Sequence, residues 1–118
     1  MTRDQVLDLC ASLPGAVEDQ PFGDGVAVFK VGRKMFALVP LAGEPDSVNL
    51  KCDPDWALEL RAVYAAVRPG YHMNKRHWNT VELDGSVDED ELRVMVEHSY
   101  ELVVRRLPRR ERDGLTGS

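Results

Sequence analysis

The sequence VAVFKVGRKMFALVPLAGEPDSVNLKC, residues 26–52, contains three apolar runs separated by turn residues. The runs at 26–31 and 35–39 flank the tripeptide Gly32-Arg33-Lys34, a pattern typical of two strands joined by a tight turn. The second run lacks polar alternation, which predicts a strand that is buried on both faces. Residues 47–52 alternate between apolar and polar side chains, as a strand with one buried face does. Residues 26–52 therefore predict three strands of an antiparallel meander.

Amphipathic helices are predicted on both sides of this meander. Residues 2–5 have the form of a capping box and begin a helix predicted over residues 3–13. Asp53-Pro54 supplies the N-cap and the first position of a second helix, which is predicted to end at residues 68–70. The apolar face of this second helix is predicted to consist of Trp56, Leu60, Val63 and Val67.

The rest of the chain predicts a further strand and a long final helix. Residues 80–83 form the strand, and residues 86–89 have the form of a second capping box. The apolar face of the final helix is predicted to consist of Leu92, Met95, Val96, Ser99, Val103 and Leu107. Pro108 ends this helix, and residues 109–118 are predicted to form a flexible tail. The order of elements predicts an α+β fold, a two-layer sandwich in which an antiparallel sheet carries helices on one face.

Composition limits the class of protein. The chain has 118 residues, 43% apolar and 30% charged, which suits one globular domain over residues 1–118. No segment approaches the roughly 18 consecutive apolar residues of a membrane-spanning helix. Its two cysteines, Cys10 and Cys52, exclude a disulfide scaffold and a four-cysteine zinc site. We therefore expect a cytoplasmic protein with no membrane association.

Charge is distributed unevenly along the chain. The formal net charge is −5, which repels nucleic acid at long range. Residues 60–81, however, contain no acidic residue and carry the four cations Arg61, Arg68, Lys75 and Arg76. A second basic run with five arginines spans residues 105–112 and is interpreted as a solvated helix end. Acidic residues gather instead at 88–91. For the choice of binding partner, the position of the charges along the chain therefore matters more than the net charge.

Residues 69–80, PGYHMNKRHWNT, form the most unusual segment of the sequence. Basic and aromatic side chains alternate here between two regular elements, a composition that suits phosphate contact combined with stacking on a base or sugar. In the alternative interpretation, Tyr71 and Trp78 anchor the core while Lys75 and Arg76 are merely solvated. The residues alone leave both interpretations open.

The string YHMNKRHWNTV, residues 71–81, closely resembles the signature of the MmcQ/YjbR-like family of small bacterial proteins. Three further stretches agree with that family, namely residues 13–16, 50–54 and 99–100. The similarity covers residues 6–107 in the expected order. This resemblance implies the element order α-β(3)-α-β(2)-α, in a fold similar to the frataxin-like and secretion-chaperone-like folds.

The same resemblance implies a function, because members of the family are commonly labelled as DNA-binding. The contacts to DNA or to another anion that it implies are Lys51, His72, Asn74, Lys75, Arg76, His77 and Trp78. A patch of three or four cations predicts weak duplex binding, with a log–log salt slope of about −3 to −4. The predicted function is therefore a non-enzymatic DNA-binding module that uses the loop at residues 71–78.

The same sequence allows other functions. In the main alternative, the same loop lines a pocket for a small anionic ligand or for a peptide of a protein partner. An enzyme has less support, because no nucleophile–base pair or phosphate-binding motif is present and only imidazoles could act as acid or base. His72 and His77 have a spacing found in zinc sites, but no third ligand is evident, so no metal or cofactor is predicted. We expect a monomer or a weak dimer.

Overall fold

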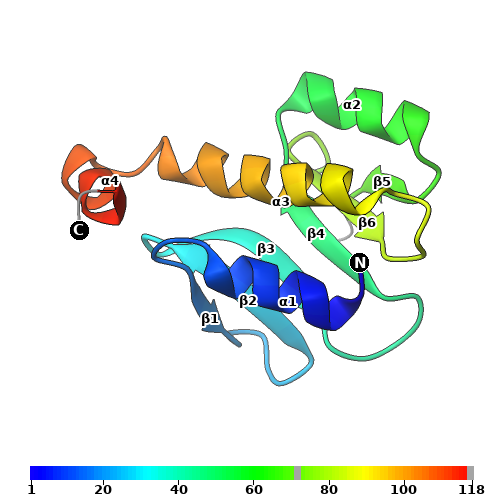
Figure 1. The fold of residues 1–118 in the computed structure, drawn as a ribbon, viewed down its shortest axis with the longest axis horizontal. Coiled ribbons are helices and arrows are strands. Elements are labelled where there is room, and N and C mark those ends of the chain that lie inside the picture. The colour runs from blue at the N-terminus through cyan, green and yellow to red at the C-terminus, as the bar shows by residue number, and fades with distance from the viewer. Residues whose placement is uncertain (71–72, 117–118) are drawn as a thin grey trace.

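Six strands form one antiparallel sheet, with helices packed against it (Figure 1). The computed structural model describes residues 1–70 and 73–116. The elements, in chain order, are α1 (Arg3–Ser12), β1 (Val17–Asp19), β2 (Val26–Val31), β3 (Lys34–Pro40), β4 (Ser47–Lys51), α2 (Pro54–Val63), β5 (Val67–Pro69), β6 (Trp78–Glu82), α3 (Glu89–Val104) and α4 (Arg109–Thr116). The strand order in this part of the chain is β1-β2-β3-β4-β6-β5. The predicted α+β fold is confirmed.

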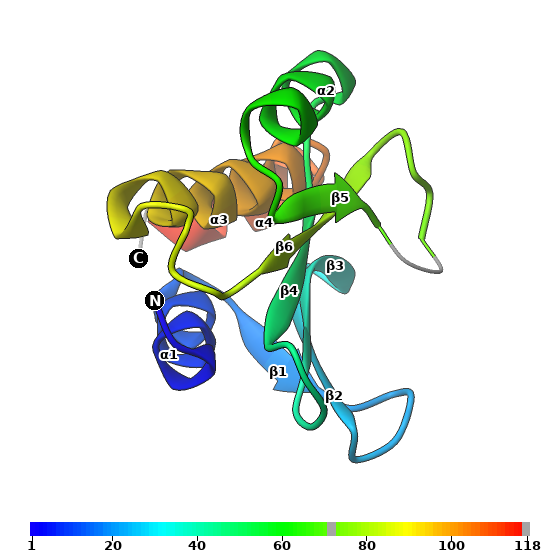
Figure 2. The ribbon, with the colours of Figure 1, turned by 90° about the vertical axis from the view of Figure 1, so that its right-hand side faces the viewer.

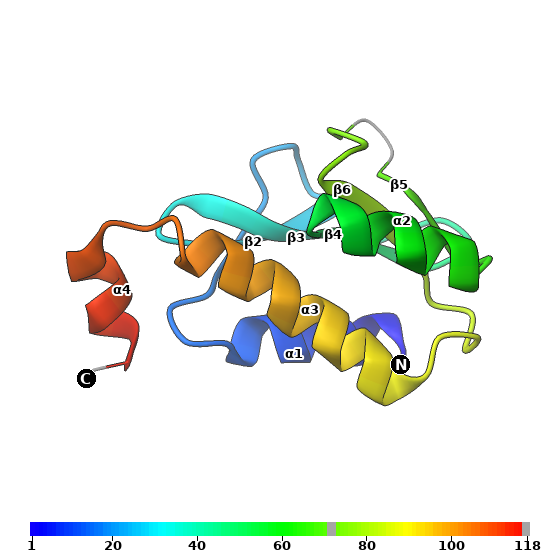
Figure 3. The same cartoon turned by 90° about the horizontal axis from the view of Figure 1, so that it is seen from above.

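Helices α1 and α3 cover one face of the sheet (Figures 2 and 3). The opposite face, here called the open face, is flanked by the loops that precede β2 and β6, which project away from these two helices. Alternation along the strands assigns side chains to the two faces. In β4, Val48 and Leu50 belong to the core beneath the helices, whereas Ser47, Asn49 and Lys51 lie on the open face.

The predicted meander corresponds to β2, β3 and β4, and the alternation predicted for β4 is confirmed. The two strands between α2 and α3 that the family resemblance implied are β5 and β6, whereas the short strand β1 was not predicted. All three residues of β1 are exposed, so it has no apolar alternation, and it is defined only by pairing with β2. Val67 of β5 was assigned to the preceding helix, but it pairs with Val81 of β6.

Helix α2 is therefore shorter than predicted. It ends at Val63, after which Tyr64 has an extended conformation. The buried residues of α2 are Ala57 and Leu60, whereas Val63 is 71% exposed. The face predicted from the periodicity was thus wrong at its last two positions, because the pairing of Val67 in the sheet replaces a further turn of helix. The predicted caps are correct, with Asp53 at the N-cap and Pro54 at the first position.

Helix α3 supplies much of the core, and its predicted face is confirmed. Every residue of that face is buried, namely Leu92, Met95, Val96, Ser99, Val103 and Leu107. The helix ends at Val104, however, so Leu107 and the predicted end at Pro108 lie beyond it. Its N-cap is Asp88 rather than the predicted Ser86, because the Ser86 hydroxyl donates instead to the carboxylate of Asp84 at 2.6 Å. None of the helices in the described ranges is both long and apolar enough to cross a membrane.

Residues 109–116 form helix α4 where the sequence predicted a flexible tail. The C-terminal end of this helix lies close to the sheet, where Leu115 packs against the core. A Cβ atom on Gly15 would lie 2.2 Å from a methyl carbon of Leu115, so the two segments touch. The apolar anchor at Leu115 explains the difference, since a single half-buried leucine after a polar stretch leaves no helical periodicity to recognise. Residues 117–118 of the predicted tail lie outside the described ranges.

Candidate functional site

A turn built around Asn74 gives the loop before β6 its shape. The Asn74 side-chain Oδ1 accepts a hydrogen bond from the backbone N–H of Arg76 at 2.9 Å. The Asn74 carbonyl accepts bonds from the N–H groups of His77 and Trp78, at 3.2 and 2.9 Å. Asparagine commonly closes turns in this way, because its side-chain oxygen mimics a backbone carbonyl. Asn74 was predicted to contact an anion, and its side-chain oxygen is already engaged in this hydrogen bond to the protein's own backbone.

Arg61 of α2 anchors the same loop. Its Nε donates to Oδ1 of Asn79 at 2.7 Å, and its Nη2 donates to the carbonyls of Lys75 and of Trp78. Asn79 is one of the few buried polar residues, with 2% of its surface exposed. One guanidinium therefore joins α2 to the last turn of the loop and to the beginning of β6.

Trp78 lies in a small apolar cluster on the open face. Its ring packs with Val28 and Leu38, Met73 packs against the same cluster, and only 8% of Trp78 is exposed. Gly70 is so close that a Cβ there would lie 2.8 Å from the Cβ of Trp78. The ring is therefore not presented for stacking on a base. Trp78 matches the core-anchor alternative rather than the predicted role as a contact.

Basic side chains meet where β4 ends and β6 begins. The N–H of Cys52 donates to the His77 carbonyl at 2.7 Å, which brings the end of β4 against the loop. Lys51, His77 and Arg106 line one hollow of about 90 Å³. Lys34 is near enough to Lys51 for the two charges to interact. Lys34, Lys51, His77 and Arg106 are here called the basic cluster.

Repulsion within the basic cluster affects Lys51. Burial lowers the pKa of the Lys51 ammonium below its usual value, and the positive charges of Arg106 and Lys34 lower this pKa further. Among the residues the structure describes, no ion pair involves Lys34, Lys51 or Arg106. Asp53 also lines the hollow, but in the described residues it forms no ion pair with these cations, so a bound anion would still stabilise the like charges held together there.

Ser99 of α3 holds the backbone of Lys51 in place. The Lys51 N–H donates to the Ser99 hydroxyl at 2.8 Å, and that hydroxyl donates to the Phe36 carbonyl at 2.5 Å. The register between β3 and β4 pairs Ala37 with Leu50, so Phe36 and Lys51 are the next residues along. The buried hydroxyl therefore bridges two backbone groups at the position where the ladder of β3 and β4 ends.

The structure divides the predicted contact residues among several places. Lys51 and His77 belong to the basic cluster, whereas Lys75 lines a separate groove on the open face. Arg76, which lies between Lys75 and His77 in the sequence, is exposed. His72 lies outside the described residues.

Sequence reasoning did not include Arg106 and Lys34 in this site. Arg106 belongs to the basic run that was interpreted as a solvated helix end, and Lys34 to a turn. Lys34 lies near Lys51 because β3 pairs with β4, and Arg106 lies near it because α3 packs on these two strands. The basic run at 105–112 was the signal that could have indicated Arg106.

His98 forms a second polar contact near the basic cluster. Its Nε2 accepts a hydrogen bond from the N–H of Asp53 at 3.1 Å, and its ring meets Trp56 edge-on with centroids 4.6 Å apart. Burial lowers the pKa of His98, and Arg105 lowers it further, while Asp53 and Glu101 act in the opposite direction. An accepting Nε2 requires the unprotonated nitrogen, so the geometry and the pKa shift both favour neutral His98.

This pKa shift makes stability depend on pH. Because the folded-state pKa of His98 lies below its unfolded value of about 6.5, the unfolded chain binds the proton more readily. His98 therefore contributes its full stability above about pH 6.5 and loses it progressively as the pH falls through the folded-state pKa. We expect urea denaturation to show this decline, and His98→Gln, which keeps an acceptor without titrating, to lack that part of it. An equally steep decline in His98→Gln would assign the pH dependence to other groups.

Burial disfavours the thiolate form of both cysteines. Burial raises the pKa of Cys10 to about 12 and is also the main cause that raises the pKa of Cys52 to about 12. Both residues are buried, as the apolar positions predicted for them imply. Thiols held in the protonated form are poor nucleophiles. Their role in the described structure is packing.

Comparison with known proteins shows similarity over most of the chain. The YjbR family model matches residues 11–102. The protein YjbR of Escherichia coli is 38% identical over 113 residues, which cover 95% of each chain. The protein YbdF of Escherichia coli is 40% identical over 104 residues, which cover 87% of this chain and 84% of YbdF.

Solved structures agree with these relatives. The crystal structure of a Deinococcus radiodurans protein with a DUF419 domain superposes with a TM-score of 0.90 at 39% identity, covering 97% of this chain and 87% of that one. The crystal structure of a Pseudomonas syringae protein superposes with a TM-score of 0.76 at 30% identity, covering 87% of this chain and 99% of that one. The family signature predicted at residues 71–81 is thereby confirmed, and the chain belongs to the YjbR family.

Proposed function

We propose that this protein binds nucleic acid through the phosphate backbone, with the basic cluster as the central contact. The observation that carries the proposal is the meeting of Lys34, Lys51 and Arg106 without an ion-pair partner in the described part of the chain. Holding like charges together costs free energy in the free protein. Phosphate groups would offset that cost and release their own counterions on binding.

The separation of charge makes this contact compatible with the formal net charge of −5. Helix α3 begins with Glu89, Asp90 and Glu91, and Arg105 and Arg106 follow its other end. A helix of 16 residues is about 24 Å long, more than twice the Debye length at physiological salt. A polyanion at the basic cluster is thus screened from the acidic end of the molecule.

The proposed contact is to the backbone of the nucleic acid rather than to its bases. Trp78 is buried and offers no stacking surface. Cations that meet phosphate groups carry no sequence information. Binding should therefore be weak and independent of sequence, and the protein would act by binding without catalysing a reaction. The exposed cations Lys75 and Arg76 would extend the contact from the neighbouring loop.

Arg106→Glu tests this proposal against a matched control, Arg93→Glu. Both arginines are exposed, both reversals change the net charge equally, and Arg93 lies near the acidic beginning of α3. Fluorescence anisotropy would follow a labelled random duplex and a matching single strand from about 20 to 200 mM salt. The wild type is expected to bind with a micromolar Kd and a log–log slope of about −3 to −4. Arg106→Glu should weaken binding and reduce the magnitude of that slope by about 1, whereas Arg93→Glu should change both less.

Two outcomes would contradict the proposal. Absence of binding by the wild type at about 20 mM salt would exclude a backbone contact of this size. Equal losses in the two single variants would show that only net charge matters. The double variant Lys75→Glu/Arg76→Glu tests the loop separately, and unchanged affinity in that variant would remove the loop from the interface. Both of its side chains are exposed, so the fold should survive.

A further inference from the structure

The open face carries a groove that is separate from the basic cluster. It lies over β4, β5 and β6, between the loop at residues 41–46 and the beginning of the loop before β6, and its volume is about 570 Å³. Cavities of about 300–1,000 Å³ are typical of small-molecule sites. The hollow beside Lys51 is far smaller, at about 90 Å³. Of these two hollows, the groove is the one with room for a whole small molecule.

Polar side chains of two paired strands form the floor of this groove. Asn49 of β4 lies directly opposite Thr80 of β6, and the Thr80 hydroxyl donates to the Asn49 Oδ1 at 2.5 Å. This bond fixes the Asn49 amide so that its Nδ2 remains the donor end. Ser47 adds a hydroxyl at the other end of β4. The floor thus offers both donors and acceptors to a ligand that bears hydroxyl groups.

Two cations border the groove. Arg68 of β5 forms an ion pair with Glu82, in which its Nη2 lies 2.9 Å from the Glu82 Oε1. The other N–H groups of Arg68 belong to the same planar guanidinium. Lys75 has no ion-pair partner in the ranges that the structure describes, and its side chain is exposed. The residues that line the groove include these two cations and no carboxylate. Its lining therefore favours an anionic group, with Lys75 as the cation that has no ion-pair partner in the described residues and Arg68 as a further donor beside its pair with Glu82.

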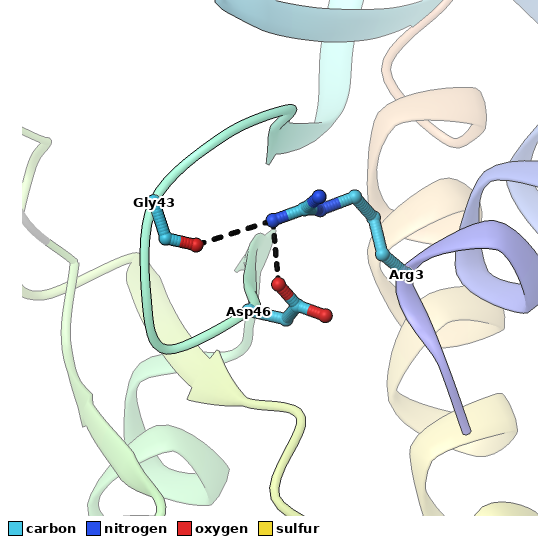
Figure 4. Close-up of polar contacts among 3 residues, drawn as sticks. All are labelled: Arg3, Gly43 and Asp46. Carbon is cyan, nitrogen blue, oxygen red and sulfur yellow. Dashed lines mark hydrogen bonds and ion pairs between the residues drawn. The ribbon is translucent and has the colours of Figure 1, made fainter.

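The walls of the groove are apolar and held in place. Pro40, Pro45 and Pro69 contribute rigid rings to the lining. Figure 4 shows how Arg3 of α1 fixes the loop that carries Pro45, because its Nη2 donates to the Gly43 carbonyl and to the Asp46 carboxylate. A wall anchored in this way is preorganised, which lowers the entropy cost of binding.

From this combination we propose that the groove binds a small phosphate ester that bears hydroxyl groups, of the size of a sugar phosphate or a mononucleotide. Lys75 and Arg68 would meet the phosphate. Asn49, Thr80 and Ser47 would bind the hydroxyl groups, while the proline rings would pack against the carbon skeleton. The groove shares no lining residue with the hollow of the basic cluster, although Lys75 would also extend the proposed nucleic-acid contact, and either site could exist without the other.

Isothermal titration calorimetry and amide NMR shifts would test the proposal with glucose 6-phosphate, AMP, inorganic phosphate, glucose and adenosine as probes. At least one of the two esters should bind saturably below about 1 mM, at least tenfold more tightly than inorganic phosphate or its own unphosphorylated counterpart. Shifts should concentrate on the Asn49 side-chain amide, Gly70 and Thr80. Whether glucose 6-phosphate or AMP binds more tightly distinguishes a sugar-phosphate ligand from a nucleotide.

Variants separate this site from the basic cluster. Lys75→Gln should weaken ester binding at least tenfold, and Thr80→Val, which keeps the shape of the side chain, should weaken it severalfold. Arg93→Gln serves as the charge-matched control for Lys75→Gln and should bind the ester like the wild type. Arg106→Glu should leave ester binding unchanged while it weakens binding to duplex DNA, so failure of one proposal is distinguishable from failure of the other.

Three results would overturn the proposal. One is the absence of saturable binding of both esters up to about 10 mM. Another is that inorganic phosphate binds as tightly as the esters, since the polar floor would then contribute nothing. The third is that the shifts fall on Lys51, His77 and Arg106, which would place the ester in the basic cluster.

Discussion

Replacing Ser99 by alanine is expected to lower the free energy of unfolding by about 2–4 kcal/mol, because two buried backbone groups lose the hydroxyl that joins them. Ser99 is fully buried, and its Oγ lies 2.8 Å from the Lys51 nitrogen and 2.5 Å from the Phe36 oxygen. Each backbone group that is left buried without a partner costs about 1–3 kcal/mol. The melting temperature should fall by roughly 10 °C.

Urea denaturation measures the loss, and amide hydrogen exchange locates it. The Lys51 amide should exchange faster in Ser99→Ala by more than the global loss of stability accounts for. Ser12→Ala is the matched control, since the exposed Ser12 hydroxyl donates only within α1, to the Leu9 carbonyl. That variant should stay within about 0.5 kcal/mol of the wild type. A similarly small change in Ser99→Ala would mean that Lys51 and Phe36 pair directly once the hydroxyl is gone.

The elements that could be predicted are those in which buried residues recur at a regular spacing along the chain. Alternation at residues 47–52 marked β4, and helical spacing from Leu92 to Val103 marked the buried face of α3. Strand β1 left no such signal because all its residues are exposed. Val67 carried a misleading signal, since it continues the helical spacing of α2 and yet pairs with Val81. In both strands, contacts distant in sequence decide the structure.

Only the part of the candidate site that comes from one continuous stretch of sequence could be predicted. The loop before β6 was recognised by its composition, and two of the cations it contributes remain exposed. The partners that give the site its chemistry come from elsewhere, as Arg106 does from beyond the end of α3 and Lys34 from the first position of β3. No spacing rule links these residues to Lys51. Trp78 shows the converse, since an aromatic residue in a basic loop suggested stacking and proved to be packed.

Arg61→Ala is expected to release the loop before β6 and to lower the free energy of unfolding by about 2–3 kcal/mol. The guanidinium of Arg61 donates to Asn79 and to the carbonyls of Lys75 and Trp78, and a hydrogen bond from a charged donor contributes more than a neutral one. Asn79 is almost completely buried, so its Oδ1 would lose a partner in a place that water does not reach. Arg61→Lys should recover only part of the loss, because an ammonium cannot reproduce the planar fork.

Stability alone does not identify an anchor, so hydrogen exchange provides the decisive comparison. Global destabilisation speeds exchange of all strongly protected amides by one common factor, whereas release of the loop adds a further increase confined to residues 76–78. The amides of Arg76, His77 and Trp78 all donate within the Asn74 turn and should show that increase, by about tenfold beyond the common factor. Arg93→Ala, an exposed arginine on α3, should show neither effect. Uniform acceleration in Arg61→Ala would make Arg61 a contributor to stability without a role in positioning the loop. A local increase would instead show that α2 sets the geometry in which Lys75 and His77 meet an anion.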